Sequence, residues 1–351
     1  MGLRAIWPQR VRRAEPATMT KERGTRSQVV AGATRADRVR ARDLLGPLGS
    51  LRVAGITRGR YCRAYRNFAW YMYVCGWVLR FLDEVDVALS AYVTTLYEEG
   101  EARQKANEAA AALQHYVPNL RRHLSLSWSL IAAWARHELP SRALPFTPAL
   151  LAAFCGALVR MGQMRLALSC IVGFDTLART GELLGLEAGH VTQEPHQAVI
   201  SFTQTKRGQR VGLEEAVVIS DQTVLLCLEA LCASLRPGDR LTGCSEAQLR
   251  TVWGRAAGAL ELHDAPLRPY SLRRGGATHL YRETQNLHLV AVRGRWSTLT
   301  TTRRYVDDAV ATLATLRLSD WQRSNFEALG GEFRTFLRQL QLAPSACVVA
   351  R

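Results

Sequence analysis

The sequence predicts a mostly α-helical protein with one small antiparallel β-sheet, divided into two domains. Most segments between residues 61 and 340 place apolar side chains at every third or fourth position, which is the period of a helix. Two runs of alternating β-rich sequence occur between residues 197 and 219, joined by a short polar turn. With 351 residues, of which 48% are hydrophobic and 22% charged, the chain is long enough for two ordinary globular cores.

The first domain, residues 61–143, is predicted to be a helical bundle. Its opening segment is rich in aromatic residues, and the next carries apolar residues on one stripe until Gly100, a residue suited to a helix C-terminus. An alanine-rich segment and a tryptophan-containing stripe complete the bundle. The four predicted helices cover residues 61–81, 83–100, 101–116 and 125–137.

A linker is predicted where Pro140, Pro145 and Pro148 punctuate the chain. Thr147 suits the N-cap of the helix that follows, with Pro148 at its first position. The second domain is predicted over residues 144–318. Its predicted helices are 148–161, 163–178, 221–235 and 245–260, with several short ones between 270 and 316, and its predicted strands, 197–203 and 210–219, form a hairpin.

The C-terminal segment, residues 319–351, is predicted to contain one amphipathic helix. Gly330 and Gly331 are expected to interrupt this helix and to leave room for a hinge. The apolar stripe must be covered by another surface. Its residues are Phe326, Leu329, Phe333, Phe336, Leu337 and Leu340.

The chain is strongly basic, with a formal net charge of +16 and a pI near 10.1. Such a charge attracts polyanions, so nucleic acid is the leading class of partner. Residues 1–60 contain 14 Lys/Arg and 4 Asp/Glu with almost no apolar periodicity, and are predicted to be a disordered arm. This arm fits an organellar transit peptide, a DNA-contacting or nuclear-targeting segment, or a solvated tail without function. The expected location is the nucleus in a eukaryote, with the cytoplasm or nucleoid, or an organelle, as alternatives.

Composition also predicts what the protein lacks. Eight cysteines without a Cys-x-x-Cys pair fit small buried thiols in a reducing compartment. His279 and His288 have no metal-ligand spacing, so no metal or other cofactor is expected, and both are interpreted as structural or DNA-facing. The longest apolar run, Phe68 to Leu79, is about a dozen residues and too short to span a bilayer.

The most informative pattern is the spacing of Arg273, Trp296 and Tyr305, which are separated by 23 and 9 residues. Given 43 arginines, 8 tryptophans and 10 tyrosines, about 0.03 such triples are expected by chance. Arg179, three residues before Glu182, and Lys206, in the turn of the predicted hairpin, precede this triple. The motifs read Ala178-Arg179-Thr180-Gly181-Glu182, Pro269-Tyr270-Ser271-Leu272-Arg273-Arg274-Gly275-Gly276-Ala277-Thr278-His279-Leu280, Gly294-Arg295-Trp296 and Thr301-Thr302-Arg303-Arg304-Tyr305.

In motif order and spacing, roughly residues 60–318 resemble the tyrosine recombinase (phage integrase) family. The resemblance implies a two-domain DNA clamp, in which a helical core-binding (SAM-like) domain precedes the tyrosine-recombinase catalytic domain. It also implies double-stranded DNA as partner, a mobile-element type of recombinase, and metal-independent breaking and rejoining of DNA. In this family a C-terminal helix often docks on the neighbouring protomer of a tetramer on DNA. Packing of the 319–351 helix on its own domain is the alternative.

Cleaving a phosphodiester without a metal requires a nucleophile, stabilisation of charge on the nonbridging oxygens, and a proton for the leaving 5′ oxygen. Arginine grips two phosphate oxygens at once, so Arg179 and Arg273 are the predicted clamp. Lys206 is one of three lysines among 46 basic residues, and lysine can lose a proton where guanidinium does not, so it is the predicted general acid. Tyr305 is the predicted nucleophile, giving a 3′-phosphotyrosine.

Three further residues complete the predicted site. Trp296 stands where the resembled family has histidine or tryptophan, and its indole N–H can donate to a phosphate oxygen. Tyr270 departs from the histidine usual in the family; it can donate a hydrogen bond but is a poor base at neutral pH. Glu182 is predicted to position Arg179.

The favoured function is therefore site-specific recombination or integration of DNA. The departure at Tyr270 and the long basic tail leave open a DNA-binding protein of the same fold with impaired catalysis. A type IB topoisomerase, which shares the chemistry and relaxes supercoils without a specific site, is a further alternative.

Overall fold

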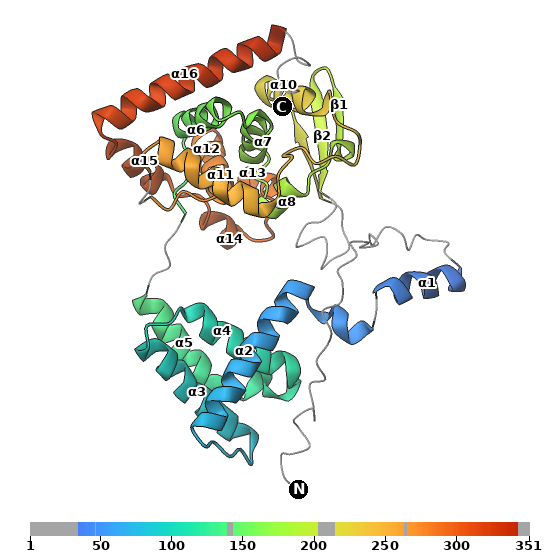
Figure 1. The fold of residues 1–351 in the computed structure, drawn as a ribbon, viewed down its shortest axis with the longest axis vertical. Coiled ribbons are helices and arrows are strands. Elements are labelled where there is room, and N and C mark those ends of the chain that lie inside the picture. The colour runs from blue at the N-terminus through green and yellow to red at the C-terminus, as the bar shows by residue number, and fades with distance from the viewer. Residues whose placement is uncertain (1–33, 46, 139–142, 203–214, 263–264, 343–351) are drawn as a thin grey trace. The chain divides into compact units, whose positions relative to one another are not determined.

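The protein was analysed as a computed structural model, which describes residues 34–45, 47–138, 143–202, 215–262 and 265–342. The chain divides into two compact units, Met1–Pro140 and Ser141–Arg351 (Figure 1). The described residues are mostly helical with one three-stranded antiparallel sheet, which confirms the predicted fold class.

Helices α2 (Gly55–Val74), α3 (Leu82–Glu98), α4 (Arg103–Tyr116) and α5 (Ser125–His137) build the core of the first unit. Alanines 106, 109, 110 and 112 of α4 are buried, and their small side chains allow α4 to pack closely against its neighbours. The buried Asp86 on α3 accepts hydrogen bonds from the Leu126 and Ser127 N–H groups at 2.8 and 2.9 Å. A distant carboxylate thus satisfies the free N–H groups at the start of α5.

The N-terminal part of this unit contains helices that the sequence pattern did not predict. Helix α1 (Arg35–Leu45) and the 3₁₀ helix η3 (Leu48–Arg52) fall within the segment expected to be a disordered arm. Thr34 caps α1 by accepting a hydrogen bond from the Asp37 N–H group at 3.2 Å. Arginine favours helix formation, so α1 forms without an apolar stripe.

The second unit surrounds a core in which α6 (Pro148–Arg160), α7 (Met164–Asp175), α10 (Gln222–Cys232) and α11 (Glu246–Ala259) meet. Both predicted helix starts are present: Thr147 accepts a hydrogen bond from Leu150 N–H at 3.2 Å, and Ser245 and Gln248 form a capping box. Three free thiols, those of Cys155, Cys170 and Cys227, lie in this core. Burial raises the pKa of the Cys155 thiol, and that of Cys227 to about 12.

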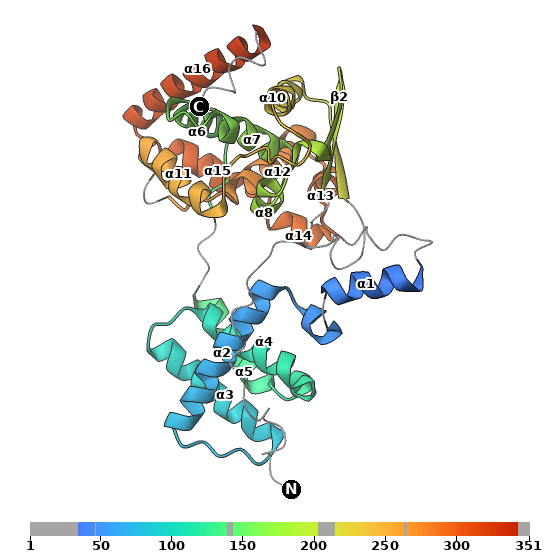
Figure 2. The same ribbon diagram turned by 45° about the vertical axis from the view of Figure 1, so that its right-hand side comes forward.

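The sheet consists of β1 (Val191–Glu194), β2 (Gln197–Phe202) and β3 (Glu215–Ile219) in that order, with β1 and β3 both antiparallel to β2. It lies at one edge of the second unit beside α10 (Figure 2). Alternate residues of β2 are buried. The hairpin of β2 and β3 was predicted and β1 was not, because β1 is short and mostly exposed. Lys206 lies outside the described residues.

Helix α16 (Asp320–Leu342) corrects one prediction, because it runs without interruption through Gly330 and Gly331. It lies along α6 of its own unit (Figure 1). A Cβ atom on Gly330 would stand 3.6 Å from that of Ala152, an ordinary van der Waals contact, so this glycine lies on the face of α16 that packs against α6. The buried residues of α16, among them Phe326, Leu329 and Phe333, join the core of this unit, and docking on a neighbouring protomer stays a prediction. No helix in the described ranges combines the length and apolar character needed to cross a membrane.

Candidate active site

Helix α12 (Ser271–Thr284) carries Arg273 at its first turn. The Arg273 side chain is fully buried, which is rare for arginine. Its guanidinium donates to the Leu177 carbonyl and, at 2.6 Å, to the Gly294 carbonyl. These bonds tie α12 to the end of α7 and to the residue after α13 (Leu287–Arg293).

Two glycines place α12 this deeply in the unit. A Cβ on Gly275 would lie 2.3 Å from the Phe146 carbonyl oxygen, and one on Gly276 would lie 2.0 Å from the Phe174 carbonyl oxygen. Both distances are far below van der Waals contact. Only glycine therefore lets the backbone approach closely enough to set the depth of Arg273.

Tyr305, which follows α14 (Leu299–Arg303), lies against the other residues of the predicted triple. Its ring centroid is 4.3 Å from that of Trp296 and 5.6 Å from that of Tyr270. The Arg273 guanidinium lies 5.3 Å from the Tyr305 ring centroid and 4.5 Å from that of Trp296, within cation–π range. The structure thus brings together four residues that the sequence placed up to 35 positions apart.

The electrostatic environment favours the ionised form of Tyr305. Burial alone raises the pKa of this hydroxyl, but hydrogen bonding from Tyr270 and Trp296 and the positive charges of Arg273 and Arg179 outweigh burial, so the net pKa is lowered. Burial and the interaction with Tyr305 raise the pKa of Tyr270. Tyr270 therefore remains protonated at neutral pH, as a donor to its neighbour.

One buried donor beside Tyr305, the Nε atom of Arg273, has no hydrogen-bond partner in the described part of the chain. Burial and the nearby charge of Arg179 lower the pKa of Arg273 to about 10, which leaves the guanidinium charged at neutral pH. Unpaired buried donors and an uncompensated buried charge are costly, and a bound anion relieves both costs. The site therefore has the chemistry of an oxyanion or phosphate pocket.

Arg179 is the N-cap of the short helix α8 (Thr180–Leu184). Its backbone N–H and guanidinium both donate to Glu182, at 2.9 and 2.5 Å. The Glu182 side chain is 4% exposed and that of Arg179 is 27% exposed. Glu182 thus fixes the orientation of Arg179, and the Arg179 guanidinium stays accessible to a ligand. This arrangement fits the predicted positioning role of Glu182. Burial raises the pKa of Glu182, but Arg295 and Arg179 outweigh it and lower the pKa.

Arg295, which sequence reasoning missed, links three parts of the site. Its guanidinium donates to Glu182 at 2.7 Å, lies 3.6 Å from a Glu215 carboxylate oxygen, and stacks 4.1 Å from the centroid of Phe202. Its φ of +57° is in the left-handed region, which a non-glycine residue adopts at a cost. Only the position of Arg295 next to Trp296 could have indicated its role from the sequence. In a chain with 43 arginines this signal is too weak to single out one of them.

The two histidines near the motif do not join this cluster. His279 pairs with Glu283 on the same helix at 3.1 Å, and His288 is exposed. The described residues contain no group of His, Cys, Asp and Glu that could hold a metal ion. Lys206 lies between β2 and β3, in the part of the chain that is not described.

Comparisons with known proteins show a family model and solved folds to which this chain is similar. The model of the phage integrase family matches residues 148–311. The Tn1549 transposon integrase, solved in complex with circular intermediate DNA, is 15% identical over 81% of this chain and 97% of its own, with a TM-score of 0.55. A lambda integrase dimer bound to a COC′ core site is 16% identical over 78% of this chain and 76% of its own, with a TM-score of 0.52. No curated protein sequence matches. At these identities the solved structures establish a shared fold.

Proposed function

Because residues 148–311 belong to the phage integrase family of tyrosine recombinases, we propose that this enzyme cleaves and rejoins DNA through a 3′-phosphotyrosine intermediate, giving site-specific recombination or integration. The observation that carries the proposal is the contact of the Tyr305 ring with Trp296 and with Arg273, whose buried Nε atom has no partner in the described residues. A nucleophile and a donor for a phosphate oxygen thus share one site.

In the cleavage step the Tyr305 phenol, whose pKa is lowered, gives its proton to water, and its oxygen attacks phosphorus to form a tyrosine–phosphorus ester bond. The bond from phosphorus to the 5′ oxygen breaks, and that oxygen takes up a proton, which we assign to Lys206. Rejoining is the reverse, with a 5′ hydroxyl attacking the phosphotyrosine. The ester conserves the bond energy, so no cofactor is needed for the second step.

The arginines stabilise the charge that develops on the nonbridging oxygens. Arg179 is accessible and already oriented by Glu182, whereas Arg273 lies beneath the rings of Trp296 and Tyr305. Tyr270, with its raised pKa, donates a hydrogen bond and does not act as the base. A tyrosine can serve at this position because the hydrogen bond that Tyr270 donates to Tyr305 favours the phenolate form of Tyr305.

Double-stranded DNA is the proposed substrate, in keeping with the net charge of +16 and with the DNA-bound integrases that share the fold. Recombination joins four strand ends, so we also propose assembly as a tetramer on DNA. The tetramer predicts four protomers for each pair of sites, which light scattering of the complex measures.

The test is covalent trapping. DNA attached to the protein is recovered from expressing cells under denaturing conditions, its junctions are sequenced, and the site is rebuilt as a nicked suicide substrate. We expect a detergent-resistant adduct that Tyr305→Phe abolishes and that Tyr97→Phe, an exposed tyrosine of the first unit, leaves intact.

Other outcomes contradict the proposal. DNA binding by the wild type without any adduct would identify a binding protein of the same fold. Relaxation of supercoiled plasmid of random sequence by the monomer would identify topoisomerase activity. Adduct formation that persists in Tyr305→Phe would require another nucleophile.

A further inference from the structure

We propose that Thr278, together with Arg274 and Arg282, positions Tyr305 for attack by fastening the segment after it to helix α12. This inference rests on the proposed function, because it assigns residues that act through the nucleophile. The three residues are spaced four apart, so they share one face of α12. We call them the α12 latch.

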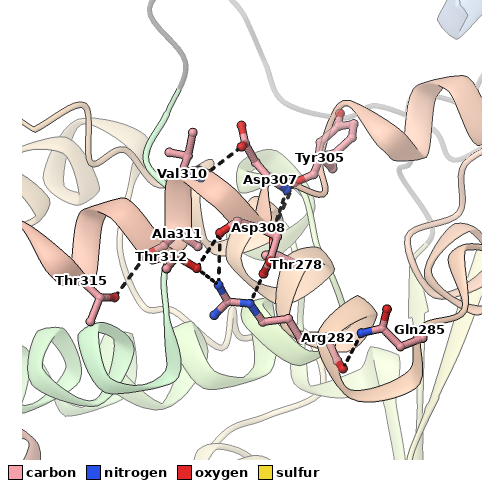
Figure 3. Close-up of polar contacts among 10 residues, drawn as sticks. All are labelled: Thr278, Arg282, Gln285, Tyr305, Asp307, Asp308, Val310, Ala311, Thr312 and Thr315. Carbon is pink, nitrogen blue, oxygen red and sulfur yellow. Dashed lines mark hydrogen bonds and ion pairs between the residues drawn. The ribbon is translucent and has the colours of Figure 1, made fainter.

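The Thr278 hydroxyl is the centre of the α12 latch (Figure 3). It donates to the Tyr305 carbonyl at 3.4 Å and accepts from the Asp307 N–H at 3.1 Å. The two bonds hold the backbone on both sides of Val306. Thr278 is 2% exposed, so water does not replace these bonds easily.

Two ion pairs extend this attachment in both directions along α12. Arg274 donates to Asp307 at 2.6 Å, with both side chains largely buried, and also donates to the Ala143 carbonyl at 2.7 Å. Arg282 forms an ion pair with Asp308 and donates to the Thr312 hydroxyl at 2.6 Å (Figure 3). Asp307 and Asp308 begin helix α15 (Asp308–Leu316), so the latch fixes the start of that helix as well.

The consequence for catalysis follows from the position of Arg273 on the same helix. Because the latch joins residues 305–308 to α12, the nucleophile and the phosphate-binding arginine are fixed relative to one helix. A displacement of a reacting group by 1 Å costs about 100-fold in rate. Loosening the latch therefore slows cleavage even though none of its three members touches the reacting atoms.

A merely structural role for these residues predicts a different result. If the latch only stabilised α15, its variants would lower thermal stability and leave the cleavage rate of the folded protein unchanged. Positioning predicts that the single-turnover rate at saturating DNA falls while the affinity for DNA does not. These two quantities separate the alternatives.

The first variant is Thr278→Val, which keeps the shape and removes the hydroxyl. We expect adduct formation on the nicked substrate to slow about 10- to 100-fold, with binding to the same duplex within about twofold. Thr278→Ser restores the hydroxyl and should recover most of the rate. Unchanged rates in folded Thr278→Val would overturn the proposal.

The second variant is Asp308→Asn. The Asp308 side chain is exposed, so this variant tests the proposal even if Thr278→Val unfolds the unit. Its matched control is Glu332→Gln, which breaks an exposed ion pair with Arg160 between α6 and α16 with the same change of charge. We expect slower cleavage for Asp308→Asn alone. Equal rates for both variants would contradict the latch, whereas a wild type that forms no adduct would reject the proposed function itself.

Discussion

At the scale of single residues, the chemistry of Tyr305 is set by its neighbours. A tyrosine with the ordinary pKa of about 10 is mostly protonated at neutral pH and is a weak nucleophile. Tyr270, Arg273 and Arg179 lower this pKa against the effect of burial. Arg273 in turn is fixed by two backbone carbonyls, so its charge stays in place during the proposed attack by Tyr305.

The pH dependence of cleavage tests this interpretation. Because the pKa of Tyr305 is lowered, the fraction of phenolate, and with it the single-turnover rate of adduct formation, should rise with pH and reach its half-maximum below about pH 10. Tyr270→Phe removes the hydroxyl that favours the phenolate, so the rising limb should move to higher pH. Tyr97→Phe is the control, and an identical profile for Tyr270→Phe would contradict the role of the hydroxyl.

The residues of the site were predictable to the extent that they follow a spacing. Arg273, Trp296 and Tyr305 stand at separations of 23 and 9 residues that resemble those of the family, so the sequence alone assigned them to one site. Arg274 and Arg295 did not stand out, because an arginine that pairs with a carboxylate far along the chain looks like any other arginine. Their partners, Asp307 and Glu182, become evident when the backbone is folded.

At the scale of elements, close packing of helices organises the second unit. Gly156 on α6 faces Leu329 on α16, and a Cβ at Gly156 would lie 2.0 Å from the Leu329 carbonyl oxygen. This close approach allows the two helices to pack with little between them. Gly275 and Gly276 likewise allow the backbone of α12 to approach Phe146 and Phe174 closely.

A pair of glycine substitutions measures the importance of this packing. Gly156→Ala should lower the free energy of unfolding by about 3 kcal/mol, because the new methyl group displaces α16 from α6. Gly254→Ala, in the exposed interior of α11 with no atom within 4 Å of the added Cβ, should raise it by about 0.5–1 kcal/mol. Urea denaturation measures the change in the free energy of unfolding for both variants. Equal changes would contradict the packing argument.

Element prediction succeeded where apolar periodicity was strong and capping residues were present. The helix after Thr147 and the one after Ser245 begin at the predicted residues, because a side-chain acceptor marks each start. Helix α1 and strand β1 were missed, since neither buries a continuous apolar face. Gly330 was misinterpreted because sequence cannot distinguish a glycine that breaks a helix from one that packs against another helix.

At the scale of the whole molecule, charge is distributed unevenly along the chain. Residues 1–60 hold a surplus of ten positive charges out of sixteen, and the remaining 291 residues hold six. Binding to a polyanion releases counterions in proportion to the number of phosphates neutralised. The N-terminal segment should therefore govern the salt dependence of binding more than the site does.

Removing residues 1–33, which contain seven Lys/Arg and two Asp/Glu, tests this expectation. The slope of log binding constant against log salt for a random duplex should become shallower, by about 0.9 for each phosphate that the shortened chain no longer neutralises. The control is the full-length chain with those seven basic residues changed to glutamine, which should behave like the truncation. Fluorescence anisotropy gives the slope, and an unchanged value would show that the segment is a solvated tail.

The helical class followed from composition and periodicity, whereas the surface that covers α16 did not. An apolar stripe shows that a helix must be covered and does not show by which surface. Helix α6 supplies that surface within the same unit, through Gly156 and Ala152.

The buried thiols of Cys155, Cys170 and Cys227 make opening of the second unit measurable by alkylation. Folded, all three are shielded from alkylating reagents, and raised pKa values keep Cys155 and Cys227 in the unreactive protonated form. Cys75 of the first unit is exposed and should be alkylated before the buried thiols. The delay between alkylation of Cys75 and alkylation of the three buried thiols therefore measures how often the core of the second unit opens. No label has to be engineered into the protein.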